Sequence, residues 1–205
     1  MTGARRGAGH RMRVATAALV AAATLVVAGC SNDDLAEQYR EGSNKGYIAG
    51  DGTVTEIAVE NRGDPIDFEG TDENGEPVSS ADYRGEVLVV NFWYAGCAPC
   101  RYEAPLLQGL NAEYTEEGGA AFLGVNVRDQ APTAVSFAET YGVTYPSVVD
   151  TDGALQLAFS GEVSPKAVPT TLVIDPEGRV AARIVGLVSE ESILDTLIKS
   201  NLGTS

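Results

Sequence analysis

Two cysteines, Cys97 and Cys100, lie where one sequence pattern gives way to another. Residues 86–94, EVLVVNFWY, form an almost continuous apolar and β-branched run, which is typical of a strand buried on both faces of a sheet. The residues that follow the cysteines carry apolar side chains at helical spacing, namely Leu106, Leu107 and Leu110. The sequence therefore predicts a buried strand that turns directly into a helix, with Cys97 at the junction.

The chemistry of this pair is narrowed by what the chain lacks. A structural zinc site needs four ligands, and the chain has only one further cysteine, Cys30, and one histidine, His10. Covalent haem attachment needs a histidine directly after the second cysteine, where this chain has Arg101. A structural disulfide stays possible, although so short a loop gains little from closure. The pattern favours a redox-active pair and predicts no metal and no cofactor.

The first 29 residues have the pattern of an export signal. Four arginines precede residues 14–28, an uncharged and mostly apolar stretch of fifteen residues. This stretch is shorter than the roughly 20 residues of a membrane-spanning helix and fits a secretory signal. It ends in Val-Ala-Gly-Cys at 27–30, which resembles the lipobox of bacterial lipoproteins. We therefore expect Cys30 to be lipidated; an uncleaved anchor and an ordinary signal peptide are the alternatives.

Charge and the position of the histidine limit the function of the exported part. Without residues 1–29 the chain has 10 Lys and Arg against 29 Asp and Glu, a net charge of −19. Such a chain repels nucleic acid, so we expect no nucleic-acid partner. His10 lies in the predicted leader, so histidine-dependent nucleophilic catalysis is excluded for the remaining domain.

The predicted position of Cys97 favours its reactive form. The first turn of a helix has unpaired N–H groups and the positive end of the helix dipole, and both stabilise a thiolate. Thiols at such positions can have pKa values between about 3.5 and 7.5. Pro99 is tolerated in the first turn. Cys100, one turn inside, is then expected to resolve the mixed disulfide that Cys97 forms.

Four separated motifs carry a family resemblance: DYRGEVLVVNFWYAGCAPCRYEAP, FLGVNVRD, YPSVVDTDG and AVPTTLVIDPEGRV. In this order they resemble the TlpA/ResA-like thiol–disulfide oxidoreductases, a membrane-tethered branch of the thioredoxin superfamily, from about Pro65 to Leu202. The resemblance implies an α/β fold, a thioredoxin-like sandwich with a mixed central β-sheet flanked by helices and a short N-terminal β extension. We expect a leader at 1–29, a flexible tether at 30–52 and this domain at 53–205.

The resemblance also implies roles for individual residues. Cys97 corresponds to the attacking thiol and Cys100 to the resolving thiol of the redox disulfide. Pro169 corresponds to a proline that the family holds in cis beside the disulfide, where the backbone at Val168 would bind substrate; a trans proline in an ordinary loop is the alternative. Glu103 corresponds to an acidic residue near the active site.

Three further positions bear on the site. Asn91 lies where thioredoxin has a buried aspartate, which favours Glu103 as the acceptor of the Cys100 proton; a solvated glutamate is the alternative. Trp93 is expected to pack beside the active-site turn, and contact with substrate is also possible. Gly96 stands where many relatives have a tryptophan before the first cysteine. The family resemblance therefore does not fix the substrate choice or the reduction potential of this chain.

Outside the site, the patterns predict further elements. Residues 52–59 and 65–70 are expected to be short strands of the N-terminal extension. The remaining strands and helices are expected at 120–127, 133–141, 146–150, 153–159, 171–175, 180–185 and 189–199. Thr133 or Asp129 is expected to cap the second helix, and Ser189 the last.

The resemblance implies a membrane-tethered enzyme on the outer face of the bacterial cytoplasmic membrane. It would reduce specific protein disulfides, such as those of apocytochrome c during cytochrome c maturation, and exchange electrons with a membrane thiol–disulfide partner. An enzyme that introduces disulfides into exported proteins is the alternative, since the same two cysteines can catalyse the reaction in the opposite direction. A peroxide-reducing enzyme is disfavoured because Tyr94 occupies the position of its threonine. A non-catalytic interaction protein is the remaining alternative.

Overall fold

The computed structural model describes residues 53–164 and 167–203. The predicted leader, the lipidation site at Cys30 and the tether lie outside these residues and stay predictions. No helix in the described part of the chain is long and apolar enough to span a membrane.

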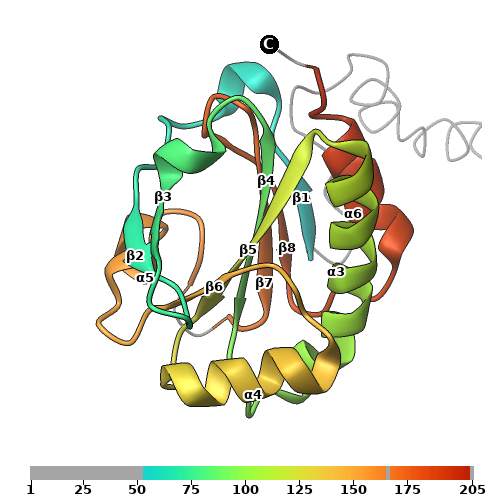
Figure 1. Ribbon diagram of the computed structural model, residues 1–205. Coiled ribbons are helices and arrows are strands. Elements are labelled where there is room, and N and C mark those ends of the chain that lie inside the picture. The colour runs from blue at the N-terminus through green and yellow to red at the C-terminus, as the bar shows by residue number, and fades with distance from the viewer. Residues whose placement is uncertain (1–52, 165–166, 204–205) are drawn as a thin grey trace, which may run out of the picture. The chain divides into compact units, whose positions relative to one another are not determined.

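A six-stranded mixed sheet forms the centre of the fold, in the order β1-β8-β7-β4-β5-β6 (Figure 1). β4 lies inside the sheet, pairing in parallel with β5 and antiparallel with β7. β5 pairs in parallel with β6, and β8 pairs antiparallel with both β7 and β1. These strands span β1 Val54–Glu56, β4 Val87–Trp93, β5 Ala120–Asn126, β6 Ser147–Val149, β7 Thr170–Ile174 and β8 Val180–Val185.

Helices and a small hairpin cover the two faces of this sheet. One face packs against α3 (Ala98–Glu117) and α6 (Glu191–Lys199), with Leu107, Leu110 and Leu194 in a shared core. The other face packs against α5 (Ala154–Ala158) and the hairpin of β2 (Glu69–Thr71) and β3 (Pro77–Ser79). Figure 1 shows these two groups on opposite sides of the sheet. The expected sandwich is confirmed.

The remaining elements are a helix near the start of α3 and two short 3-10 turns. α4 (Ala131–Tyr141) contributes Ala134 and Phe137 to a third buried cluster, which also contains both cysteines and Trp93. The turns are η2 (Val59–Asn61) and η3 (Ser80–Tyr83). Cys97 and Cys100 are therefore packed against α4 in this buried cluster.

β4 confirms the main sequence prediction. All seven of its residues are buried, as expected for a strand covered on both faces. The strand ends at Trp93, and α3 begins at Ala98 with Cys97 as its N-cap residue. The predicted junction of strand and helix thus falls where the sequence placed it.

Several boundaries and caps differ from expectation. The strand expected at 65–70 begins only at Glu69, and β3 was not predicted. The N-cap of α4 is Gln130, without a side-chain bond, because the Asp129 carboxylate accepts from Ala95 N at 2.6 Å instead. α6 begins at Glu191 after an N-cap at Glu190 that also lacks a side-chain bond, so Ser189 is not its cap.

Candidate active site

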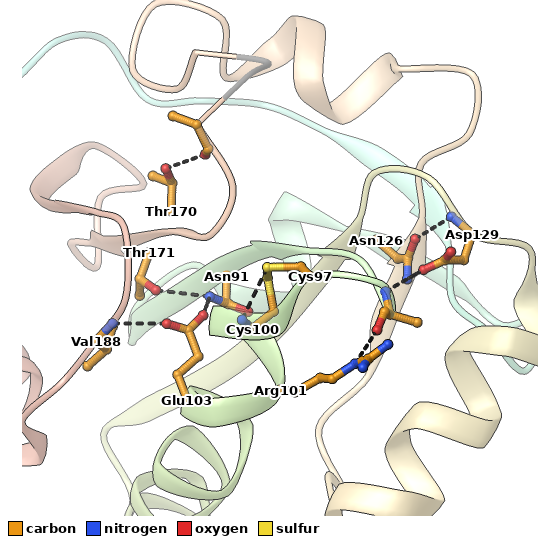
Figure 2. The surroundings of a disulfide bond; sticks show 12 residues. Asn91, Cys97, Cys100, Arg101, Glu103, Asn126, Asp129, Thr170, Thr171 and Val188 are labelled. Carbon is orange, nitrogen blue, oxygen red and sulfur yellow. Dashed lines mark hydrogen bonds between the residues drawn. A yellow bond between two sulfur atoms is a disulfide. The ribbon is translucent and has the colours of Figure 1, made fainter.

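The two cysteines form a disulfide at the first turn of α3 (Figure 2). Their Cα atoms are 5.3 Å apart. Cys97 and Cys100 are 4% and 2% exposed, while Gly96, Ala98 and Pro99 around them are exposed. The pair therefore lies just below a surface made of small, uncharged residues.

The sulfur of Cys97 occupies the place of a helix-capping group. As the N-cap residue it accepts a hydrogen bond at its Sγ from the backbone N–H of Cys100, at 3.1 Å. An N-cap side chain normally supplies an oxygen to this orphan N–H. In the reduced protein the same N–H and the helix dipole would favour a thiolate at Cys97 over the neutral thiol.

Glu103 lies one turn after Cys100 and is buried, with only 1% of its surface exposed. Its Oε1 accepts a bond from Asn91 Nδ2 at 2.8 Å, and its Oε2 accepts one from Val188 N at 2.9 Å. Burial raises the pKa of Glu103 from 4.5 to about 7, and the two hydrogen bonds oppose this rise. The alternative of a solvated glutamate is therefore wrong.

Asn91 links Glu103 to β7. Its Nδ2 also donates to Thr171 Oγ1 at 3.0 Å, and the two residues are direct partners across β4 and β7. Asn91 and Cys100 line the same small cavity of about 10 Å³ behind the disulfide, roughly the space of one water molecule. The Asn91–Glu103 pair thus lies on the buried side of Cys100.

The Val168–Pro169 peptide bond is cis, as the resemblance implied. Pro169 is buried immediately before β7, and Val168 is partly buried against the cluster that contains both cysteines. The Oγ1 of Thr170 donates to the carbonyl of Ala167 at 2.6 Å and closes the turn (Figure 2). The structure therefore places Val168 and Pro169 in the same region as the disulfide.

Trp93 is an internal packing residue of the site. It is 5% exposed, its ring lies 4.1 Å from that of Phe137 between centroids, and its Nε1 donates to Ser147 Oγ at 3.3 Å. A protein substrate approaching the exposed residues around Cys97 would meet little of this ring. Packing, the first expectation for Trp93, is confirmed, and burial disfavours its predicted contact with substrate.

The loop between β4 and α3 has supports that sequence reasoning missed. The backbone of Ala95 donates its N–H to Asp129 Oδ2 at 2.6 Å and accepts at its carbonyl from Arg101 Nε at 2.7 Å. Asn126 Nδ2 also donates to Asp129, at 3.1 Å. Figure 2 shows these groups together beside the disulfide. Asn126 and Asp129 belong to the motif FLGVNVRD, but nothing local to that motif indicates this role.

The described residues hold no group of three or more histidine, cysteine or acidic side chains that could bind a metal ion. Besides the two cysteines, the titratable groups at the site include the buried carboxyl of Glu103 and the buried phenol of Tyr145, which lines the same small cavity as Cys100. Arg101 and Asp129 lie at the loop before Cys97. This arrangement can exchange a disulfide and take up or release a proton beside it.

Comparison with known proteins agrees with this chemistry. A model of the AhpC/TSA family matches residues 63–183, more than half of the chain. The chain belongs to the AhpC/TSA family.

Several relatives of the chain are named thiol–disulfide oxidoreductases. The thiol–disulfide oxidoreductase ResA of Bacillus subtilis is 34% identical over 60% of this chain and 66% of its own length. ResA of Geobacillus kaustophilus is 36% identical over 62% of this chain and 70% of its own length. This AhpC/TSA member is a thioredoxin-like thiol–disulfide oxidoreductase like them.

Solved structures show the same fold. A DsbF homologue from Corynebacterium diphtheriae has a TM-score of 0.65 and 31% identity, covering 76% of this chain and 98% of that one. A secreted thiol–disulfide isomerase from Corynebacterium glutamicum has a TM-score of 0.64 and 30% identity, covering 75% and 95% of the two chains. The thioredoxin-like fold assignment is thereby confirmed.

Proposed function

We propose that this thiol–disulfide oxidoreductase is exported, tethered to the outer face of the bacterial cytoplasmic membrane, and reduces specific protein disulfides there. Disulfides of apocytochrome c are the proposed substrates, as the TlpA/ResA-like resemblance implies. A membrane thiol–disulfide protein would restore the dithiol. The observation that carries the proposal is the Cys97–Cys100 disulfide at the start of α3, with the buried carboxyl of Glu103 behind it.

The proposed reaction begins at Cys97. Its thiolate attacks one sulfur of the substrate disulfide, and the substrate's other sulfur leaves as a thiolate. The Cys100 thiolate then attacks Cys97 Sγ, re-forms the Cys97–Cys100 bond and releases the substrate's second thiolate. Two electrons thus pass from the enzyme's dithiol to the substrate. Val168 and Pro169 would present backbone to the substrate segment during the first step.

Glu103 supplies the proton acceptor in this proposal. Cys100 must lose a proton before it can attack, and the residue is only 2% exposed to solvent. A carboxyl with a pKa of about 7 is ionised in part at neutral pH and can accept a proton there. Asn91 would hold that carboxylate in place through the bond at 2.8 Å.

The direction of electron flow is tested by the reduction potential of the Cys97–Cys100 pair. We expect equilibrium titration of the mature chain, starting at Cys30, against glutathione or dithiothreitol couples to give a potential well below about −200 mV. A reductant needs such a value to pass electrons to a substrate disulfide. A potential near about −120 mV would instead support the alternative, an oxidant that introduces disulfides into exported proteins.

The membrane location is tested separately at Cys30. Residues 14–30 have the apolar stretch and the terminal cysteine of a lipoprotein signal. We expect the native chain, expressed in a bacterium, to collect in the membrane fraction after cell lysis. A Cys30→Ala chain should lose most of that membrane association, while Cys100→Ala, a control with the same chemical change, should retain it. Equal membrane recovery of the two variants would refute lipid anchoring at Cys30.

A further inference from the structure

The basic side chains of the described residues divide into two groups. Five of the seven form ion pairs with Asp or Glu: Arg62, Arg84, Arg179, Arg183 and Lys199. Arg101 and Arg128 form none within residues 53–164 and 167–203. A chain with a net charge of −15 offers many acidic partners, so two arginines left without one are unusual here.

Both of these arginines contact the loop that leads to Cys97. Arg101 Nε donates to the carbonyl of Ala95 at 2.7 Å, as Figure 2 shows. The guanidinium carbon of Arg128 lies 3.9 Å from the centroid of the Tyr94 ring, in a cation–π contact. The residues contacted, Tyr94 and Ala95, precede Cys97 by three and two positions, and both arginine side chains are exposed.

One acidic side chain also lies at this loop, and it does not neutralise the pair. Asp129 Oδ2 accepts hydrogen bonds from Ala95 N and Asn126 Nδ2 and forms no ion pair with either arginine. Two cations and one anion give the solvent-facing side of this loop a local positive charge, while Glu103 is buried on the other side of Cys100. Beside the loop, Ala98 and Pro99 are exposed and uncharged, and Tyr102 is 73% exposed. The surface over the disulfide therefore differs in charge from the chain as a whole.

We propose that this surface docks protein segments that carry acidic side chains next to the cysteines to be reduced. The inference rests on the proposed function and specifies its substrate class. A guanidinium group binds carboxylates in a bidentate geometry, and the terminal nitrogens of Arg101 have no partner among the described residues. An acidic protein segment is favoured over an anionic lipid surface, because the body of this chain would be repelled by such a membrane.

The acidic side chains take no part in the bond changes. They raise the number of productive encounters between the substrate disulfide and the Cys97 thiolate, whose attack and resolution by Cys100 proceed as described above. Charge complementarity of this kind acts mainly on association rates and on the choice of partner. The effect must therefore appear in the rate of the first step and must weaken at high salt.

The test uses two peptides with the same intramolecular disulfide, one with three glutamates around its cysteines and one with glutamines at those positions. The reduced full-length chain is mixed with each peptide, and the second-order rate constant for peptide reduction is measured. The readout is the ratio of the two rate constants. The double variant R101Q/R128Q is compared with R84Q/K199Q, which has the same net charge but removes two cations already held in ion pairs.

We expect the Glu-to-Gln peptide ratio to fall about threefold to tenfold in R101Q/R128Q and to stay near the native value in R84Q/K199Q. This range corresponds to the small free energy of exposed ion pairs. An altered loop in R101Q would slow both peptides alike and leave the ratio unchanged, so the ratio isolates recognition of charge.

Four results would overturn the inference. An equal ratio in both double variants, or equal slowing of both peptides by R101Q/R128Q, would show that the arginines do not select acidic segments. Loss of binding to anionic phospholipid vesicles with an unchanged peptide ratio would assign the surface to the membrane instead. If the native chain reduces neither peptide, the proposed function itself fails and this inference falls with it.

Discussion

Replacing Cys97 with serine will reduce thiol–disulfide exchange to the uncatalysed rate. The exposures of the two cysteine residues differ little, at 4% and 2%, so their positions at the start of α3 decide which one attacks. Cys97 is the N-cap residue and its Sγ receives the Cys100 N–H, whereas Cys100 lies inside the first turn. A serine hydroxyl at this position would be hydrogen-bonded equally well, but it does not form a nucleophilic anion at neutral pH.

The matched variant is Cys100→Ser, which keeps the attacking thiol and removes the resolving one. It should react once with a substrate disulfide and then stop at the mixed disulfide on Cys97. Mass spectrometry of the intact protein would detect that adduct, and a turnover assay would show no further product. Continued turnover by Cys97→Ser, or a stable adduct on Cys100 in that variant, would reverse the assignment of the two sulfurs.

Replacing Glu103 with glutamine will remove a pH dependence from both reactivity and stability. In the folded protein the pKa of Glu103 is raised by burial from 4.5 to about 7. Between these values the folded state keeps a proton that the unfolded state has lost, so the free energy of unfolding falls as pH rises. Above pH 7 Glu103 is ionised in both states, and its burial then lowers the free energy of unfolding by about 3 kcal/mol.

We therefore expect the native chain to lose about 3 kcal/mol of stability between pH 4.5 and pH 8 through this residue, and Glu103→Gln to lack that decline. Chemical denaturation at several pH values measures it. The rate at which Cys100 resolves a mixed disulfide should rise with a midpoint near pH 7 in the native chain, and the variant should lack this rise. Glu116→Gln, on the exposed side of the same helix, is the control. If it and Glu103→Gln give the same two profiles, Glu103 is not the proton acceptor.

The parts of the site that could be predicted from sequence are those with a local pattern. The apolar run of β4 and the leucine spacing of α3 each depend on neighbours within a few positions, and together they placed Cys97 at a helix start. The cis bond at Pro169 was instead predicted from the family resemblance. No feature of residues 165–170 alone distinguishes it from a trans proline.

The surroundings of Glu103 could not be predicted in the same way. Its partners Asn91 and Val188 are 12 and 85 positions away in the chain, and Asn91 in turn reaches Thr171 at a separation of 80. Such contacts arise from the order of strands in the sheet, which local periodicity does not encode. The same reason explains why Asp129 was wrongly predicted to cap α4. Its side chain accepts a hydrogen bond from the backbone N–H of Ala95, which is 34 positions away in the chain.

The two outermost strands of the central sheet, β1 and β6, are each only three residues long. Along β6, Glu73 donates its N–H to the carbonyl of Ser147 at 3.0 Å and accepts the Ser147 N–H at its side chain at 2.7 Å. Both margins are short, and at β6 the Glu73 contacts occupy part of the edge, so a second molecule finds little backbone with which to extend the sheet. The domain should therefore resist fibrous aggregation even at the high local concentration that the proposed membrane tether would create.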